Sequence, residues 1–236
     1  MNSFKKPVEV DIHDVDFNGV CRMSSLMKYI QSAAQTQLTE NGMSYESLRE
    51  RNRAFIITKI KLEFNEPVRA YDRLVAETFP CISRGFSFIR CYALYKGEKI
   101  IGRAISVWAL VDTETRKLVR VNDFELNLPT YEAWDIELSY FRMPDTMKKA
   151  GTYTVSYADL DQNMHVNNTK YADIFSNFIP LNNKRINSIN VNYVNEAKYK
   201  DELTVYTEEI GGTYYVRSVL ADGRINSEAE IHLTDL

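Results

Sequence analysis

Two stretches of the chain repeat one polar phrase, and this repeat constrains the fold more than any other feature. Residues 157–168 read YADLDQNMHVNN, and residues 12–25 read IHDVDFNGVCRMSS. Aspartates and asparagines recur at identical spacing, as Asp14, Asp16 and Asn18 in the first copy and as Asp159, Asp161 and Asn163 in the second. Where the second copy has His165, the first has Val20. A duplicated unit with an ionisable ring in only one copy predicts one working half and one half adapted to another task.

The segments that follow each phrase also repeat. MSSLMKYIQSAAQTQL predicts a helix with Ser24 or Ser25 as its N-cap and Gly42 as its stop, and NNTKYADIFSNFI predicts a second helix over about 168–178. FNEPVRAYDRL (64–74) returns as YVNEAKYKDEL (193–203), with one residue fewer before the shared aspartate. That alignment pairs Glu66 with Glu196.

Strand patterns follow the helix in each half. ITKIKLEF in the first half and INSINVNYVNE in the second half alternate as half-buried strands do, and glycine-containing corners mark hairpins between later strands. The sequence therefore predicts an α+β tandem, in which a long helix wrapped by a curved antiparallel sheet is present twice. The two sheets are expected to pair edge to edge, which also protects their edge strands. The expected domains are residues 1–125 and 151–236, joined by a polar connector over 126–150 that Trp134, Tyr140 and Phe141 could pack.

Composition excludes several classes of partner and site. The formal net charge of −3 leaves no basic footprint, so nucleic acid is not an expected partner. The three cysteines are scattered and His165 has no second histidine at ligand spacing, so no metal site is expected. The start of the chain has no apolar run of signal-peptide length, and no stretch approaches a membrane span. We therefore expect a soluble, reduced, cytoplasmic protein.

His165 is the first candidate for chemistry. Its imidazole could transfer a proton near neutral pH, and Asp161 four residues earlier could fix its tautomer. The Asn163 amide could hold a carbonyl or orient a water, and N–H groups at the start of the following helix suit a developing oxyanion. The same polar residues would also suit a capped loop with no chemistry, so spacing alone leaves both interpretations open.

Glu196 is the second candidate. Its ordinary role would be that of an exposed carboxylate at a strand end. A sheet that brought it beside His165 would make it a base for water or a direct nucleophile. The sequence contains neither a glycine-rich phosphate loop before a helix nor the elbow motif of a serine nucleophile.

The string DLDQNMHVNNTKY (159–171) closely resembles the signature of the acyl-acyl carrier protein thioesterases, the plant plastid enzymes and their bacterial relatives. With DVDFNGVCRMSSLMKYIQ and WALVDTETRKLVR, the resemblance covers nearly the whole chain. It implies a tandem hotdog fold, with the acyl-chain pocket in the N-terminal hotdog and the catalytic residues in the C-terminal one. No plastid transit peptide precedes the repeat, so the bacterial members are expected to be the closer match.

The resemblance implies an enzyme that hydrolyses fatty acyl-acyl carrier protein, releases free fatty acid and terminates fatty acid synthesis, with no metal or organic cofactor. The family's catalytic Asp, Asn and His fall on Asp161, Asn163 and His165, and its carboxylate falls on Glu196. Plant members commonly carry a cysteine after that glutamate, whereas this chain has Ala197. A cysteine nucleophile is therefore excluded at this position, and we expect Glu196 to activate water.

The resemblance also suggests where the substrate binds. The acyl chain is expected against Met23, Met27 and Ile30, and backbone N–H groups near Val166 and Asn167 are expected to stabilise the oxyanion. The acidic carrier protein is expected to contact Lys170, Lys198 and Lys200. The oligomeric state is left open between monomer and homodimer. Alternatives are an acyl-CoA thioesterase, a hotdog hydratase or dehydratase, and a non-catalytic acyl-thioester-binding protein.

Overall fold

The computed structural model describes residues 3–136, 138 and 140–236. Residues 1–2 of the first expected domain, and 137 and 139 of the expected connector, lie outside the described residues. The α-helices are α1 (Met23–Glu40), α2 (Tyr45–Glu50) and α3 (Lys170–Ser176). Short 3₁₀ turns lie at Ile12–Asp14, Val121–Asp123 and Tyr157–Asp159. The strands are β1 (Phe4–Glu9), β2 (Arg53–Phe64), β3 (Arg73–Pro80), β4 (Phe88–Lys96), β5 (Lys99–Asp112), β6 (Leu118–Val119), β7 (Lys148–Thr154), β8 (Lys184–Tyr193), β9 (Glu202–Ile210), β10 (Thr213–Leu220) and β11 (Ile225–Asp235).

One antiparallel sheet runs through the molecule. Its strand order is β1-β3-β4-β5-β2-β8-β11-β10-β9-β7, with β6 paired to β5. Counted outward from the centre, β2 to β1 in one direction matches β8 to β7 in the other, so the two halves have the same topology. They join where β2 pairs with β8, with Leu62 opposite Ile189. The predicted α+β tandem with edge-to-edge pairing of its sheets is therefore confirmed.

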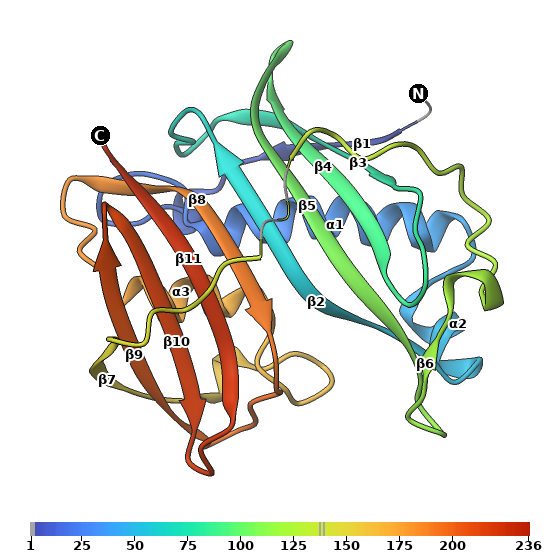
Figure 1. Ribbon diagram of the computed structural model, residues 1–236. Helices are drawn as coiled ribbons and strands as arrows, with labels where there is room; N and C mark the ends of the chain where they lie inside the picture. Colours follow the sequence, from blue (N-terminus) through green and yellow to red (C-terminus); the bar gives the residue numbers. More distant parts are fainter. Residues whose placement is uncertain (1–2, 137, 139) are drawn as a thin grey trace.

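The helices lie on one face of this sheet and the connector crosses the other, as Figure 1 shows. α1 buries Met27, Ile30 and Ala33 at helical spacing, and these residues pack against the strands. Its N-cap is Arg22 and not Ser24 or Ser25, because the helix begins at Met23 and both serines already lie inside its first turn.

α3 is shorter than the helix expected over 168–178. Before its first turn, the Asn167 side chain accepts hydrogen bonds from the N–H (3.0 Å) and hydroxyl (2.9 Å) of Thr169, which favours a turn over a helix. After its last turn, the N–H groups of Asn177 and Phe178 bond to carbonyls three residues earlier, which tightens the chain and ends the helix.

The main core continues from one half into the other. It includes Met27 of α1, Phe175 of α3, and Leu62 and Ile189 on the two sides of the central strand pair. A smaller cluster on the outer face consists of Phe79, Cys81, Cys91, Ile105 and Ile136.

The three expected aromatic anchors of the connector differ in their surroundings. Trp134 contacts the outer cluster. Tyr140 instead is 96% exposed, and its ring lies 4.3 Å from the Lys59 ammonium, which is also 5.8 Å from the ring of Phe141. β7 begins at Lys148, inside the stretch expected to be connector. Among the described residues, no helix is both long and apolar enough to cross a bilayer.

Candidate active site

The second polar phrase folds into a tight loop held by one carboxylate. Asp161 Oδ1 accepts the backbone N–H groups of Asn163 (2.8 Å) and His165 (3.5 Å). The Asp161 N–H donates to the His165 carbonyl at 2.9 Å, and Met164 turns the chain with a φ of 62°. The Asp161 carboxylate thus fixes the loop backbone. Within the described chain it makes no bond to the imidazole, contrary to the expectation that it sets the tautomer.

The first polar phrase folds into the same loop. Asp16 Oδ1 accepts the N–H groups of Asn18 (2.8 Å) and Val20 (3.1 Å), and the Asp16 N–H donates to the Val20 carbonyl at 2.8 Å. Gly19, with a φ of 69°, occupies the position of Met164. The aspartates of the repeated phrase therefore shape the backbone in both halves, whether or not an imidazole is present.

Backbone hydrogen bonds also align the segments that follow, and they correct one prediction. The Val166 N–H donates to the Ala197 carbonyl at 2.9 Å, and the equivalent bond in the first half joins Cys21 to the Val68 carbonyl at 2.8 Å. Ala197 therefore corresponds to Val68. With this alignment, the two segments have the same number of residues before the shared aspartate, and no residue is missing.

The counterpart of Glu196 is thus Pro67, and pairing Glu196 with Glu66 was wrong by one position. The matching Asn-Glu letters misled the alignment because they shift the two segments by one residue. Glu66 instead forms an ion pair with Lys99. The first half therefore has neither the imidazole nor the carboxylate of the second half.

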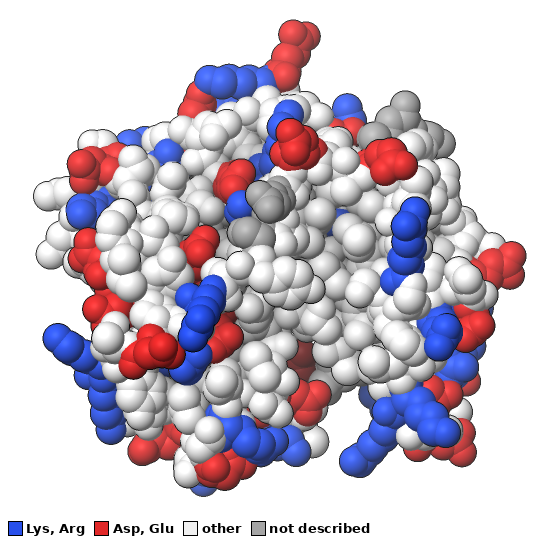
Figure 2. All heavy atoms as spheres, viewed as in Figure 1, with Lys and Arg blue, Asp and Glu red and all other residues white. Residues whose placement is uncertain are grey.

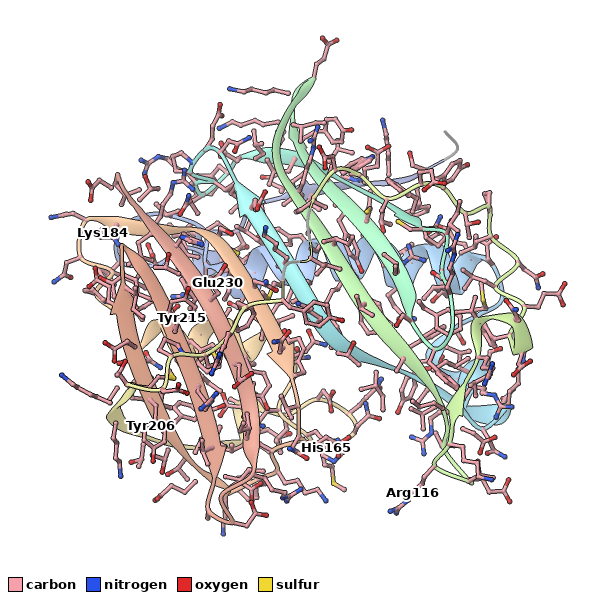
Figure 3. The ribbon with its side chains drawn as sticks, viewed as in Figure 1. Arg116, His165, Lys184, Tyr206, Tyr215 and Glu230 are labelled. Atoms are coloured by element: carbon pink, nitrogen blue, oxygen red, sulfur yellow. The ribbon has the colours of Figure 1, made fainter. Side chains whose placement is uncertain are left out.

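The structure brings His165 and Glu196 together. His165 Nε2 lies 3.1 Å from Glu196 Oε2, and their side chains are 28% and 55% exposed. The backbones of His165 and Lys198 form an antiparallel bridge, which holds the loop against the segment that carries Glu196. In Figure 3, His165 lies in the lower part of the view, between the second half and the first-half hairpin that carries Arg116. A carboxylate and an imidazole at this separation can share or relay a proton.

A cavity of about 420 Å³ reaches this loop from the first half. Its walls come from α1, α2, the sheet of the first half and the loop itself. Apolar residues that line it include Ala34, Leu38, Leu48, Phe55, Phe88 and Trp108. At the loop it is bounded by Gln162, Asn163, Asn167 and Thr169.

The residues expected to line the acyl pocket lie elsewhere. Met27 and Ile30 are 0% and 1% exposed and belong to the core, because they point into the sheet from the buried side of α1. Met23 lines a second cavity of about 430 Å³ beside the first loop. The neighbouring side of α1, with Ala34 and Leu38, faces the first cavity instead.

The backbone N–H groups expected to stabilise the oxyanion already donate hydrogen bonds to backbone carbonyls. The Val166 N–H bonds to the Ala197 carbonyl (2.9 Å) and the Asn167 N–H bonds to the Asp159 carbonyl (2.8 Å). The helix begins only at Lys170, so these two N–H groups belong to the loop. Asn167 still borders the cavity.

A residue that the sequence did not suggest also touches the loop. The Tyr45 hydroxyl, at the start of α2, donates to Asn163 Oδ1 at 2.8 Å. The two residues are 118 positions apart in the chain, so no local pattern could pair them.

The three lysines expected to receive a carrier protein differ in environment. Lys170 lies 3.7 Å from Asp173 and is about one-quarter exposed at its side chain. Lys198 and Lys200 are exposed near Glu196. Figure 2 shows basic and acidic side chains interspersed over the face in view. Across the described ranges, no group of three or more His, Cys, Asp or Glu side chains is arranged to hold a metal ion.

Comparison with known proteins gives consistent matches. Family models for the acyl-ACP (acyl carrier protein) thioesterase N-terminal and C-terminal domains match residues 1–127 and 143–234. The chloroplastic oleoyl-acyl carrier protein thioesterase 1 of Arabidopsis thaliana is 23% identical over 239 residues, which cover 89% of this chain and 66% of the relative. The chain spans between 45% and 66% of the length of the plant relatives that it matches.

Two solved structures share the fold. An acyl-ACP thioesterase from Bacteroides thetaiotaomicron is 24% identical, covers 98% of both chains and has a TM-score of 0.89. The 12:0-ACP thioesterase from Umbellularia californica is 18% identical, covers 99% of this chain and 98% of its own, and has a TM-score of 0.82. The expected tandem hotdog fold is therefore confirmed.

Proposed function

Because the chain belongs to the acyl-ACP thioesterase family, we propose that it hydrolyses fatty acyl-acyl carrier protein to free fatty acid and so terminates fatty acid synthesis. The observation that carries this proposal is the 3.1 Å contact between Glu196 and His165, whose loop borders an apolar cavity through Gln162 and Asn163. A thioester whose acyl chain fills the cavity would present its carbonyl near this loop.

The proposed chemistry needs one water and no cofactor. Glu196 takes a proton from water as the water oxygen attacks the thioester carbonyl carbon. The C–S bond then breaks, and the proton passes to the departing pantetheine sulfur. His165 donates Nε2–H to the carboxylate and orients it, while Asn163 offers its amide to the carbonyl oxygen. Ala197, which is fully buried, offers no nucleophile beside Glu196.

We also propose a division of labour between the halves. Residues 1–125 would hold the acyl chain, residues 151–236 would supply His165 and Glu196, and 126–150 would connect them. The cavity walls on α1, α2 and the first-half sheet support this division. The acyl-chain length is set by how much of the cavity the chain fills, and each methylene contributes roughly 1–3 kcal/mol of discrimination.

The carrier protein is proposed to dock beside Glu196, on Lys198 and Lys200. Their exposure supports this, because an acidic partner can reach exposed ammonium groups at a rim. Lys170 is a weaker candidate since Asp173 already neutralises it. A cytoplasmic setting is proposed on the grounds that Cys21, Cys81 and Cys91 are all free.

The proposal is tested by measuring fatty acid release from acyl carrier protein loaded with a series of chain lengths. Wild type is compared with His165→Ala and Glu196→Gln, both of which are expected to lose at least 100-fold in kcat, within the range that acid–base groups supply. Glu66→Gln is the matched control, because Glu66 is a first-half carboxylate that forms an ion pair with Lys99. It should retain wild-type turnover.

The same assay separates the alternatives. Turnover of acyl-CoA but not of acyl carrier protein substrates would indicate an acyl-CoA thioesterase. An enoyl or hydroxyacyl product would indicate a hydratase or dehydratase, and binding without turnover would indicate an acyl-thioester-binding protein. Full activity of Glu196→Gln would remove Glu196 from the mechanism.

A further inference from the structure

The asparagine of the polar phrase is used differently in the two loops. In the first loop, Asn18 Nδ2 donates to the carbonyls of Leu181 (2.7 Å) and Lys184 (3.0 Å). Both hydrogens of that amide are therefore occupied by the second half of the molecule. Asn18 joins the two halves and has no donor left for a ligand.

Asn163 presents the opposite side of its amide to the other half. Its Oδ1 accepts the Tyr45 hydroxyl at 2.8 Å, and Arg49 Nη1 donates to that same hydroxyl oxygen at 3.1 Å. Because Arg49 can only donate, it leaves the hydroxyl hydrogen available, and Tyr45 gives that hydrogen to Asn163 Oδ1. In this arrangement the amide oxygen faces Tyr45, which leaves the NH₂ group to donate elsewhere.

The Asn163 NH₂ group has no protein acceptor among the described residues. Across residues 3–136, 138 and 140–236, no acceptor forms a hydrogen bond with Asn163 Nδ2, whereas both hydrogens of the Asn18 amide are bonded. Asn163 and Tyr45 both line the cavity. The N–H groups of Val166 and Asn167 are bonded to carbonyls, so they cannot serve the substrate oxygen. A donor for that oxygen has to come from elsewhere in the site.

We infer that Tyr45, held by Arg49, is a positioning residue that keeps the Asn163 amide hydrogens directed at the thioester carbonyl oxygen. The inference rests on the proposed function and adds the first half's contribution to the reacting centre. Without the Tyr45 hydroxyl, the amide is free to rotate and to present its oxygen, which would repel the developing oxyanion.

The position of Tyr45 is well defined by α2. Ser44 caps this helix by accepting the Ser47 N–H at 3.2 Å, and Leu48 is 7% exposed against the first half. The Arg49 guanidinium lies 5.7 Å from the centre of the Tyr45 ring, so it steadies the ring as well as the hydroxyl. The amide is thus oriented by an element anchored in the other half.

Steady-state kinetics of Tyr45→Phe test the inference. This change removes the hydroxyl and keeps the ring, and we expect kcat to fall about tenfold with KM little changed, as for a lost hydrogen bond felt mainly in the transition state. Asn163→Ala should fall about 100-fold or more. In the Asn163→Ala background, Tyr45→Phe should have no further effect, because the two residues act as a unit.

Two further variants define the role of the donor chain. Arg49→Met should reproduce part of the kcat loss seen in Tyr45→Phe. Arg49→Lys should keep kcat near the wild-type value, because lysine can still donate a hydrogen bond to the Tyr45 hydroxyl. Asn18→Ala is the matched control. It removes two hydrogen bonds to carbonyls of the second half and should therefore lower the Tm, while kcat stays at the wild-type value. Equal kcat losses from Tyr45→Phe in both the wild-type and Asn163→Ala backgrounds would overturn the inference.

An NMR titration makes the test independent of turnover. The ligand is a pantetheine ketone analogue, in which a methylene replaces the thioester sulfur. The Asn163 side-chain NH₂ signal, identified by its loss in Asn163→Asp, should shift on binding in wild type and shift much less in Tyr45→Phe. If the NH₂ signal of the wild-type protein does not shift on binding, the inference is overturned but the proposed function is not. Absence of hydrolysis of every thioester, with the NH₂ shift intact, would instead contradict the proposed function.

Discussion

Asp14 illustrates how a single carboxylate supports the first loop. It accepts the hydroxyls of Ser25 (2.9 Å) and Tyr29 (2.5 Å) and so ties the loop to α1. Burial alone raises the pKa of Asp14, but the hydrogen bonds from Tyr29 and Ser25 outweigh it, and the pKa is lowered below its usual value. A carboxylate with this shift stabilises the folded state when it is ionised.

Stability should therefore depend on pH through Asp14. Its folded pKa lies below the unfolded value of about 3.9, so its contribution is present above that pH and is lost as pH falls through the folded pKa. Asp14→Asn should lower the Tm at pH 6 and flatten its fall between about pH 5 and pH 3. Thermal scans of both proteins across that range check this, and parallel curves would contradict it.

Met164 adopts the left-handed backbone that Gly19 adopts in the first loop. A side chain at this φ costs about 1–2 kcal/mol, whereas glycine has no such cost but loses about 0.5–1 kcal/mol in chain entropy. Met164→Gly should therefore raise the free energy of unfolding slightly, by up to about 1 kcal/mol. Urea denaturation measures it. Gly19→Met is the reciprocal variant and should lower the free energy of unfolding. An increase would contradict the prediction.

At the scale of elements, β2 and β5 meet at a position that only glycine fits. Gly102 lies opposite Phe64, and a Cβ at Gly102 would collide with the Phe64 ring, which is 4% exposed. Gly102→Ala should destabilise by about 1–3 kcal/mol. Phe64→Leu in the same chain should recover part of that loss in urea denaturation, because it opens the space. Additive losses would show that the clash is not the cause.

The helix α1 sets the width of the cavity at Ala34. Ala34 is 6% exposed and lines the cavity with the smallest side chain on that side of the helix. Ala34→Leu should lower kcat/KM for the longest acyl chains by roughly tenfold or more and spare the shorter ones, since about three methyl or methylene groups would intrude. A chain-length series on acyl carrier protein measures the change. A uniform loss at all lengths would place Ala34 outside the acyl path.

Periodicity predicted the elements well where one side is buried and the other is exposed. α1 and the alternating strands were foreseen for this reason. Side-chain bonds such as those of Asn167 have no periodic signature, so the shortening of α3 was not foreseen. The shared Asn-Glu letters also placed Glu196 opposite Glu66. The correct alignment is visible only in the backbone hydrogen bonds to the Ala197 and Val68 carbonyls.

At the scale of the whole molecule, the two halves share one sheet and one core. Leu62 and Ile189 are register partners on β2 and β8, and both are fully buried. The halves should therefore unfold in a single transition. Coincident near- and far-UV circular dichroism curves test this, and two separated transitions would contradict it.

The seam can also be probed by substitution. Leu62→Ala and Ile189→Ala should each cost about 2–5 kcal/mol, and their combined effect should depart from the sum because they line one site. Urea denaturation of the two single variants and the double variant measures this coupling. A purely additive double variant would mean that the halves do not support each other there.

Hydrogen-bond partners mark the limit of prediction from this sequence. The duplicated topology and the candidates His165 and Glu196 could be inferred from the repeat and the resemblance. The role of Asp161 in the backbone, the occupied N–H groups of Val166 and Asn167, and the contact of Tyr45 with Asn163 could not. Each depends on which donor and acceptor meet in space, and a single sequence does not record those partners.

The intact backbone of the first loop has an evolutionary consequence. The first loop has Val20 in place of the imidazole and Pro67 in place of the carboxylate, yet the Asp16 bonds that shape it match those of the second loop. Ancestry in a duplicated gene would leave this trace, in which reactivity is lost before architecture. The second cavity beside that loop is already present. Laboratory evolution starting from Val20→His and Pro67→Glu would thus begin from a scaffold that has already been built.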